Sequence, residues 1–341
     1  MADKGKNVSR RDFAKLMAKG AVGLSTLPLI GTKLAGADEP AAGGASASTA
    51  KDARVCIVTS KTPIPKGDEA KQLFNTMLDE GIKAATGGKT PDEFMKASFK
   101  KDDRVAIKVN NYGFKGHRGP QLAAAICEKL QAAGLTPENI LVYENSDGAL
   151  SSARYKINFD GPGFRCYGTD RVGHMKEELK YGATTVRYSK IIEWCTAIIN
   201  MPSLKAHNMA GVTICLKNHY GSIEDPRKYH ANDCDPGIAD INSTDIIKNK
   251  TRLCVCDATK ILFAGGPEWL GQYTVDYNGI LVSTDPVALD AIGNSLIKKF
   301  RKNSGMKQLP YNPVAKQIKT AQKNGIGVAD LDRIELIEVS I

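Results

Sequence analysis

The residues best suited to chemistry gather in the segment 195–231, which holds three of the chain's five histidines. A lysine ammonium group neutralises an anion, and an imidazole transfers a proton or ligates a metal near neutral pH. An asparagine adds hydrogen-bonding groups that orient a ligand. This combination predicts a site for an anionic or metal-bound ligand, built from Lys205, His207, Lys217, Asn218, His219 and His230.

The elements that must position these residues follow from apolar periodicity. A β-branched run at 196–200 predicts a buried strand that Met201 and Pro202 end, and residues 211–219 are expected to form a helix. Further strands are expected at 54–60, 104–109, 139–143, 184–188, 252–256, 279–283 and 333–339, and helices at 68–85, 120–134, 287–300 and 313–323. This alternation favours an α/β fold with a mostly parallel sheet flanked by helices, and it leaves open a division into two lobes.

Polar side chains recur where the expected strands end. In open α/β sheets the carboxyl ends of parallel strands form the rim at which ligands bind. Glu144 and Asp147 follow one such strand. At the same rim we expect His207, His230 and Lys205 to be catalytic, Lys108, Asn110, Lys217, Asn218 and Asp285 to bind a cofactor or anion, and His207, His230 and Asp257 to be candidate metal ligands.

Several of these residues also have purely structural interpretations. Asp285 precedes Pro286 and fits the N-cap of the helix at 287–300. Lys108 fits a solvated strand end, and His219 fits packing against Tyr220. These alternatives stay open at the level of the sequence.

Eight cysteines are present, and none is arranged as CxxC. An iron–sulfur cluster held by this chain alone is therefore not expected, whereas a metal ion held by other ligands is left open. Cys254 and Cys256 would share one face of a strand, a poor geometry for a disulfide between them. Cys234 lies close to His230 in the sequence and is a further candidate for the site.

The N-terminal segment reads as an export signal. Arg10 and Arg11 begin a motif that resembles the twin-arginine (Tat) signal, a weakly apolar stretch follows, and Ala37 ends a small-residue cleavage pattern. We expect a signal peptide at 1–37, a flexible linker at 38–52 and an α/β body at 53–341. The Tat translocase would then be a partner, the mature protein would be periplasmic, and no membrane span would remain after cleavage. The alternative is a basic amphipathic helix on a cytosolic protein.

The net charge of +10 is misleading as a sign of nucleic-acid binding. The first 37 residues hold seven Lys and Arg against two Asp, so half of the net charge lies in the expected signal. The remainder has no arginine-rich run, and only 6% of the chain is aromatic. A modest positive field favours a small anionic ligand over a nucleic acid.

Five short motifs together resemble a bacterial and archaeal family known as a domain of unknown function, number 362. They lie at 107–110 (IKVN), 200–207 (NMPSLKAH), 216–221 (LKNHYG), 256–258 (CDA) and 283–293 (STDPVALDAIG), within a family-like region of about 104–300. The resemblance implies an α/β fold and brings no established activity or catalytic residues. Some members carry ferredoxin-like cysteine segments, which this chain lacks.

These observations favour an exported enzyme that uses a metal or cofactor on a small anionic substrate, with redox or racemase- and isomerase-like chemistry both open. In residue types and general shape the chain also bears a looser similarity to nickel-pincer lactate racemases. The alternative is a periplasmic protein that binds a cofactor, metal or ligand without turnover. A purely structural envelope protein would not need lysines and histidines gathered at strand ends.

Overall fold

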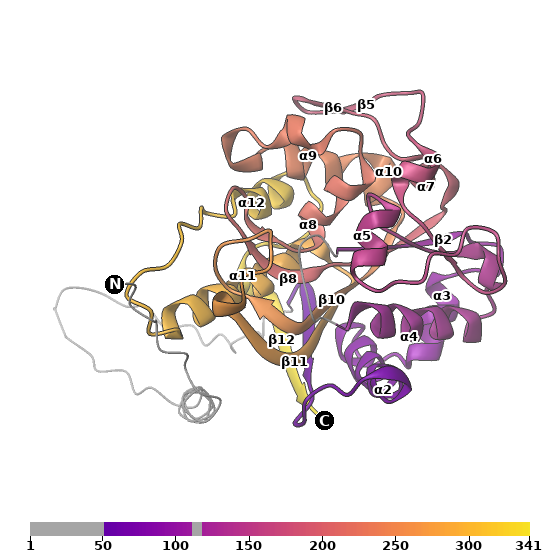
Figure 1. Ribbon diagram of the computed structural model, residues 1–341, viewed down its shortest axis with the longest axis horizontal. Helices are drawn as coiled ribbons and strands as arrows, with labels where there is room; N and C mark the ends of the chain where they lie inside the picture. Colours follow the sequence, from indigo (N-terminus) through magenta and orange to yellow (C-terminus); the bar gives the residue numbers. More distant parts are fainter. Residues whose placement is uncertain (1–50, 111–117) are drawn as a thin grey trace, which may run out of the picture. The chain divides into compact units, whose positions relative to one another are not determined.

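A ten-stranded mixed sheet organises the computed structural model, which describes residues 51–110 and 118–341 (Figure 1). The strands are β1 (Ala53–Thr59), β2 (Val105–Val109), β3 (Ile140–Tyr143), β4 (Arg165–Cys166), β7 (Ala197–Met201), β8 (Ser203–His207), β9 (Gly211–Thr213), β10 (Thr251–Leu262), β11 (Thr274–Ser283) and β12 (Ile334–Ser340). A separate two-stranded sheet joins β5 (Leu179–Tyr181) to β6 (Thr184–Val186).

The large sheet is mostly parallel, as the sequence predicts. Its order is β12-β1-β11-β10-β7-β2-β3-β4, and β8 pairs with both β10 and β9. The exceptions are β11, which is antiparallel to both of its neighbours, and the β8–β9 hairpin. The fold is therefore α/β with one reversed strand inside the sheet.

The helices connect and cover these strands. They are α2 (Gly67–Ala85), α3 (Pro91–Ser98), α4 (Gly119–Ala132), α5 (Asp147–Ser152), α6 (Thr169–Val172), α7 (Lys190–Trp194), α8 (Cys215–Asn218), α9 (Gly237–Ser243), α10 (Asp245–Lys248), α11 (Pro286–Asn303) and α12 (Lys316–Lys323). Short 3-10 turns lie at η1 (Pro137–Asn139), η2 (His219–Ser222), η3 (Pro226–Tyr229), η4 (Asn232–Cys234), η5 (Gly271–Tyr273) and η6 (Leu331–Arg333).

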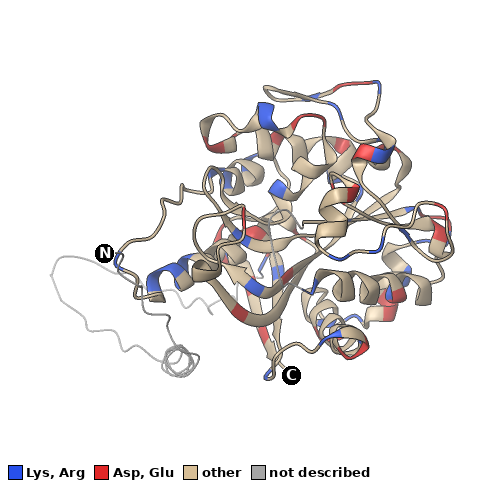
Figure 2. Cartoon of the chain, in the orientation of Figure 1, with Lys and Arg blue, Asp and Glu red and all other residues tan. Residues whose placement is uncertain are grey.

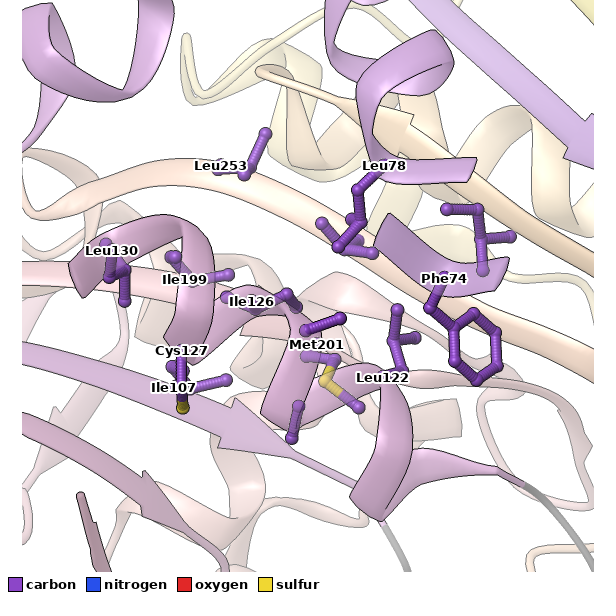
Figure 3. Packing of buried hydrophobic residues seen from close by; sticks show 14 of the residues in the cluster. Phe74, Leu78, Ile107, Leu122, Ile126, Cys127, Leu130, Ile199, Met201 and Leu253 are labelled. Carbon is purple, nitrogen blue, oxygen red and sulfur yellow. The ribbon is translucent and has the colours of Figure 1, made fainter. Parts of the chain in front are cut away.

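One face of the sheet packs against α2, α3 and α4 to form the main hydrophobic core (Figure 3). On α2 the buried residues include Phe74 and Leu78, which are spaced to share one side of the helix. They meet alternate strand residues such as Ile107 and Ile199. Burying each such side chain stabilises the fold by roughly 1.5–3 kcal/mol. Alternation along β2 then points Lys108 to the opposite face.

The opposite face is covered in part by α11, which contacts β1, β10 and β11. It also approaches the β8–β9 hairpin closely at Gly293, where a Cβ would lie 2.7 Å from Ile214 and 2.9 Å from Leu204. Contacts join the described residues of the α/β body into one compact unit.

The segment that carries the site departs from the predicted structure. Residues 211–219 are not one helix: β9 comes first and α8 follows. The β-branched Val212 and Thr213 pair with Ala206 and Lys205 of β8, which explains the strand. Pro202 separates β7 from β8, so the extended segment continues beyond it. Both strands pair with β10.

The expected signal peptide at 1–37, and the linker up to residue 50, lie outside the described residues. Within the described chain, every helix is too short or too polar to cross a bilayer. Acidic and basic residues are interspersed over the described elements (Figure 2).

Candidate functional site

A row of polar side chains crosses the middle of the sheet on the face away from α2 and α4. Lys108 of β2 stands beside Tyr143 of β3 on one side and Asn200 of β7 on the other. All three are almost completely buried. Their register puts them on one face because neighbouring parallel strands share their pleat.

Lys108 forms a buried ion pair at the centre of this row. Its Nζ donates to Glu144 Oε1 at 2.7 Å and to Asn218 Oδ1 at 3.2 Å. Burial lowers the pKa of Lys108, and the neighbouring Glu144 opposes that shift. The pair is enclosed so tightly that a Cβ at Gly221 would lie 2.6 Å from Lys108 Nζ. A larger residue at position 221 would displace the Lys108 ammonium group from this position.

A hydrogen-bond chain extends from Lys108 through η2. Asn218 Nδ2 donates to Asn200 Oδ1 at 2.8 Å, and Asn200 Nδ2 lies 3.4 Å from His219 Nε2. Because Asn200 donates, the His219 proton belongs on Nδ1, which lies 3.2 Å from Ser222 Oγ. Burial lowers the pKa of His219 to about 3. His219 is therefore a neutral link in the scaffold, held by Asn200 and Ser222.

Lys205 extends the site along β8. Its Nζ donates to Asn110 Oδ1 at 2.7 Å, and Ser203 Oγ donates to the Asn110 carbonyl at 2.9 Å. Burial, opposed by Glu144 and assisted by the charges of Lys108 and Lys217, lowers the pKa of Lys205 to about 7. Lys205 therefore changes its protonation state near neutral pH.

His207, two residues along β8, is fixed as a neutral ring. Its Nδ1 accepts hydrogen bonds from the backbone N–H groups of Met209 at 3.0 Å and Ala210 at 3.2 Å. An accepting Nδ1 requires the ring proton on Nε2. Burial, with the positive charges of Lys217 and Lys205 and the His230 ring, lowers the pKa of His207 to about 2. His207 can therefore offer an N–H donor, and it is a very weak base.

Lys217 and His230 complete the cluster. Lys217 Nζ lies 3.3 Å from His230 Nε2 and 3.8 Å from the centre of the Tyr220 ring. The Nδ1 of His230 lies 3.0 Å from the carbonyl of Pro226, so Nδ1–H donates there and Nε2 accepts from Lys217. Burial lowers the pKa of Lys217 to about 8, and burial with Lys217 lowers that of His230. The rings of His207 and His230 lie 6.1 Å apart.

A carboxylate from α11 anchors α8, the helix that carries Lys217 and Asn218. Asp290 accepts from the backbone N–H of Cys215 at 2.7 Å and of Leu216 at 3.2 Å. Burial raises the pKa of Asp290 to about 8, while these hydrogen bonds oppose the shift. The sequence does not reveal this role, because Asp290 lies within an amphipathic helix pattern far from residue 215.

The candidate metal ligands are not brought together. His207 and His230 are neighbours, but within residues 51–110 and 118–341 no three His, Cys, Asp or Glu side chains form a group suited to a metal. Asp257 Oδ1 accepts from the backbone and hydroxyl of Thr259. Moreover, the Nε2 of His230 faces a lysine ammonium group, which repels a cation. The arrangement suits an anion better.

The family model for DUF362, a domain of unknown function, matches residues 105–295, more than half of the chain. The chain belongs to this family. The matched region holds all the site residues described above. Among solved structures, the DUF362 chain is similar to the lactate racemase apoprotein from Thermoanaerobacterium thermosaccharolyticum, with 10% identity and a TM-score of 0.37. The match covers 71% of this chain and 56% of that chain, so the protein spans little more than half the length of that structure. No curated protein matches the chain.

Asp285 also lies within the DUF362 match, but its expected place at the shared rim is wrong. It follows β11, and β11 runs antiparallel to β1 and β10, so its carboxyl end lies at the opposite edge of the sheet. There the carboxylate accepts from the N–H groups of Val287, Ala288 and Val328. Asp285 is the N-cap of α11.

Removing this cap should cost stability without affecting the site. We expect Asp285→Ala to lower the free energy of unfolding by about 0.5–2 kcal/mol, because the first turn of α11 loses its acceptor. Urea denaturation measures the loss, and calorimetry should give unchanged anion binding. The assignment would be contradicted if Asp285→Ala were as stable as the wild type, or if the folded variant no longer bound the anion.

The sequence left out several residues that complete the cluster. Asn200 accepts a hydrogen bond from Asn218, the Tyr220 ring lies against Lys217, and Asp290 anchors α8 through the backbone of Cys215. Cys234 lies under the His230 carbonyl, with Sγ 3.9 Å from the oxygen, and burial raises its pKa, although Lys217 opposes this. All eight cysteines are free and buried.

Proposed function

We propose that this DUF362 protein is an enzyme that transfers a proton on a small organic anion, in racemase- or isomerase-like chemistry. Lys205 carries the proposal. It is completely buried, its Nζ is held by Asn110, and its pKa is lowered to about 7. A general acid–base group works best when its pKa lies near the working pH. A buried lysine with no chemical role would be costly to keep.

The charge of the cluster favours an anionic substrate. Three lysines are buried in the described chain, namely Lys108, Lys205 and Lys217, and Lys108 pairs with Glu144. Their mutual repulsion lowers the pKa of Lys205. A bound anion would relieve this repulsion, because each unit of negative charge stabilises the ammonium forms.

The roles of the histidines follow from their protonation. His207 would orient the substrate through its Nε2–H, since its Nδ1 is occupied by the backbone. His230 would keep Lys217 in position beside Tyr220. Lys205 would therefore remove the proton, with His207 as hydrogen-bond donor rather than as base. Redox chemistry with a bound cofactor remains the second form of the enzyme proposal.

Export belongs to the proposal as well. The twin-arginine motif, the apolar stretch and the small-residue pattern ending at Ala37 support delivery by the Tat translocase to the periplasm, with loss of residues 1–37. The intact mass of the protein recovered from the periplasm tests the cleavage site directly.

Hydrogen–deuterium exchange on candidate substrates tests the activity. Protein exported through its own signal and purified without chelators is incubated in heavy water with lactate, malate and pyruvate. We expect deuterium to enter at carbon next to the carboxylate or carbonyl, as seen by proton NMR, and Lys205→Met to abolish it. Tight binding without exchange would favour the alternative, a ligand-binding protein. If the protein shows no binding of these anions and no exchange, the proposal of an anion site is wrong.

A further inference from the structure

One buried hydroxyl beside this site is left without a partner. Thr213 lies in β9 and is only 4% exposed, yet its Oγ1 has no hydrogen-bond partner among the described residues. Buried hydroxyl groups are nearly always paired, because leaving one unsatisfied costs free energy. An unpaired donor at such a place indicates that the partner is a ligand or a water molecule.

The strand register aims this hydroxyl at the site. Thr213 stands directly opposite Lys205 in the antiparallel β8–β9 hairpin, and Gly211 stands opposite His207. Directly opposed residues share a face, with Cβ atoms about 4.5–5.5 Å apart. Residues two apart in one strand also share a face. The side chains of Thr213, Lys205 and His207 therefore lie on the same face of the hairpin.

The neighbouring side chains confirm which face this is. Leu204 precedes Lys205 and Ile214 follows Thr213, and both lie against Gly293 of α11 in the apolar core. The alternating residues must then face away from α11, toward Asn110, which holds Lys205.

We propose that Thr213 binds an oxygen of the substrate carboxylate and so determines specificity. The inference rests on the proposed function and deepens it. Lys205 supplies an N–H donor in either protonation state, Thr213 a hydroxyl donor and His207 an Nε2–H donor, all on one face. Three donors that share this face match the lone pairs of a carboxylate, which accepts several hydrogen bonds at once. Thr213 is a binding residue and takes no part in the proton transfer.

The test compares Thr213→Val with Thr213→Ser. Valine keeps the shape and removes the hydroxyl, whereas serine keeps the hydroxyl. Lactate binding is measured by calorimetry at about pH 6, below the pKa of Lys205 of about 7, so that Lys205 is charged. We expect Thr213→Val to weaken binding about tenfold or more, and Thr213→Ser to retain most of the affinity. Thr59→Val, in β1, is the matched control and should bind as the wild type does.

Thermal melting separates binding from folding. Because the hydroxyl is unsatisfied in the ligand-free protein, Thr213→Val should melt no lower than the wild type.

Binding that is unchanged in Thr213→Val while Lys205→Met abolishes it would overturn the inference and leave the proposed function standing. Loss of binding in both Thr213→Val and Thr213→Ser would overturn it too, by assigning the effect to packing. A wild-type protein that binds no carboxylate would overturn both. Inorganic phosphate that binds more tightly than lactate, with the same dependence on Thr213, would overturn the carboxylate assignment.

Discussion

Lys205→Arg should reduce deuterium exchange at about pH 8 by about 100- to 10,000-fold, the usual contribution of a general base. A guanidinium group stays protonated throughout this pH range, so the variant keeps a cation and loses the base. Binding of the carboxylate should persist. Proton NMR gives the exchange rate, calorimetry gives the affinity, and thermal melting shows whether the larger side chain is tolerated in the buried site. Lys205→Met, which loses both charge and base, should lose both exchange and binding.

The pH dependence of the wild type sharpens the same prediction. Lys205 is an ammonium group below its pKa of about 7 and a neutral amine above it. Exchange should therefore rise with pH through about 7 and then level off, whereas binding of the anion should weaken over the same range. The Lys205→Arg variant should bind with little change across it. Exchange that is independent of pH between about 6 and 8 would rule out Lys205 as the base.

Glu144→Gln should destabilise the fold by about 3–5 kcal/mol at neutral pH, because it leaves the buried Lys108 ammonium group without its counter-charge. Both side chains of the pair are buried, and Nζ and Oε1 are 2.7 Å apart. Urea denaturation measures the loss. The loss should shrink as pH rises, since Lys108, whose pKa is already lowered, becomes neutral more readily without Glu144. Stability should also recover when Lys108→Met is added to Glu144→Gln.

An exposed ion pair provides the matched control for Glu144. Glu335 lies 2.6 Å from Arg54, and both side chains are more than 40% exposed. Because solvent screens such pairs, Glu335→Gln should change stability by only about 0–1 kcal/mol. If Glu144→Gln costs no more than Glu335→Gln, the buried pair does not have the role assigned to it.

Much of the fold could be predicted because apolar periodicity is local. Strands β1, β2, β3 and β7 and helices α2, α4 and α11 follow from alternation and amphipathic spacing within single segments. The proximity of Lys108, Asn110 and Lys205 also followed, since neighbouring parallel strands bring their carboxyl ends together.

The rest depended on partners that are distant in the sequence. Residues 211–213 form a strand because β8 lies beside them, and periodicity over so few residues does not reveal that pairing. The direction of β11 is set by its neighbours β1 and β10, so the misplacement of Asp285 could not be seen locally. Asp290 acts on residues 215 and 216 only because α11 packs beside α8.

The pairing of β1 constrains the order in which the chain can fold. β1 lies between β11 and β12, so every strand partner of residues 53–59 is synthesised more than 200 residues later. Until Ile334–Ser340 leaves the ribosome, the apolar β1 has an open edge, and such edges promote aggregation. Sequence separations this large also slow folding. A nascent chain in which β11 and β12 have not yet emerged should therefore expose both edges of β1 to aggregation.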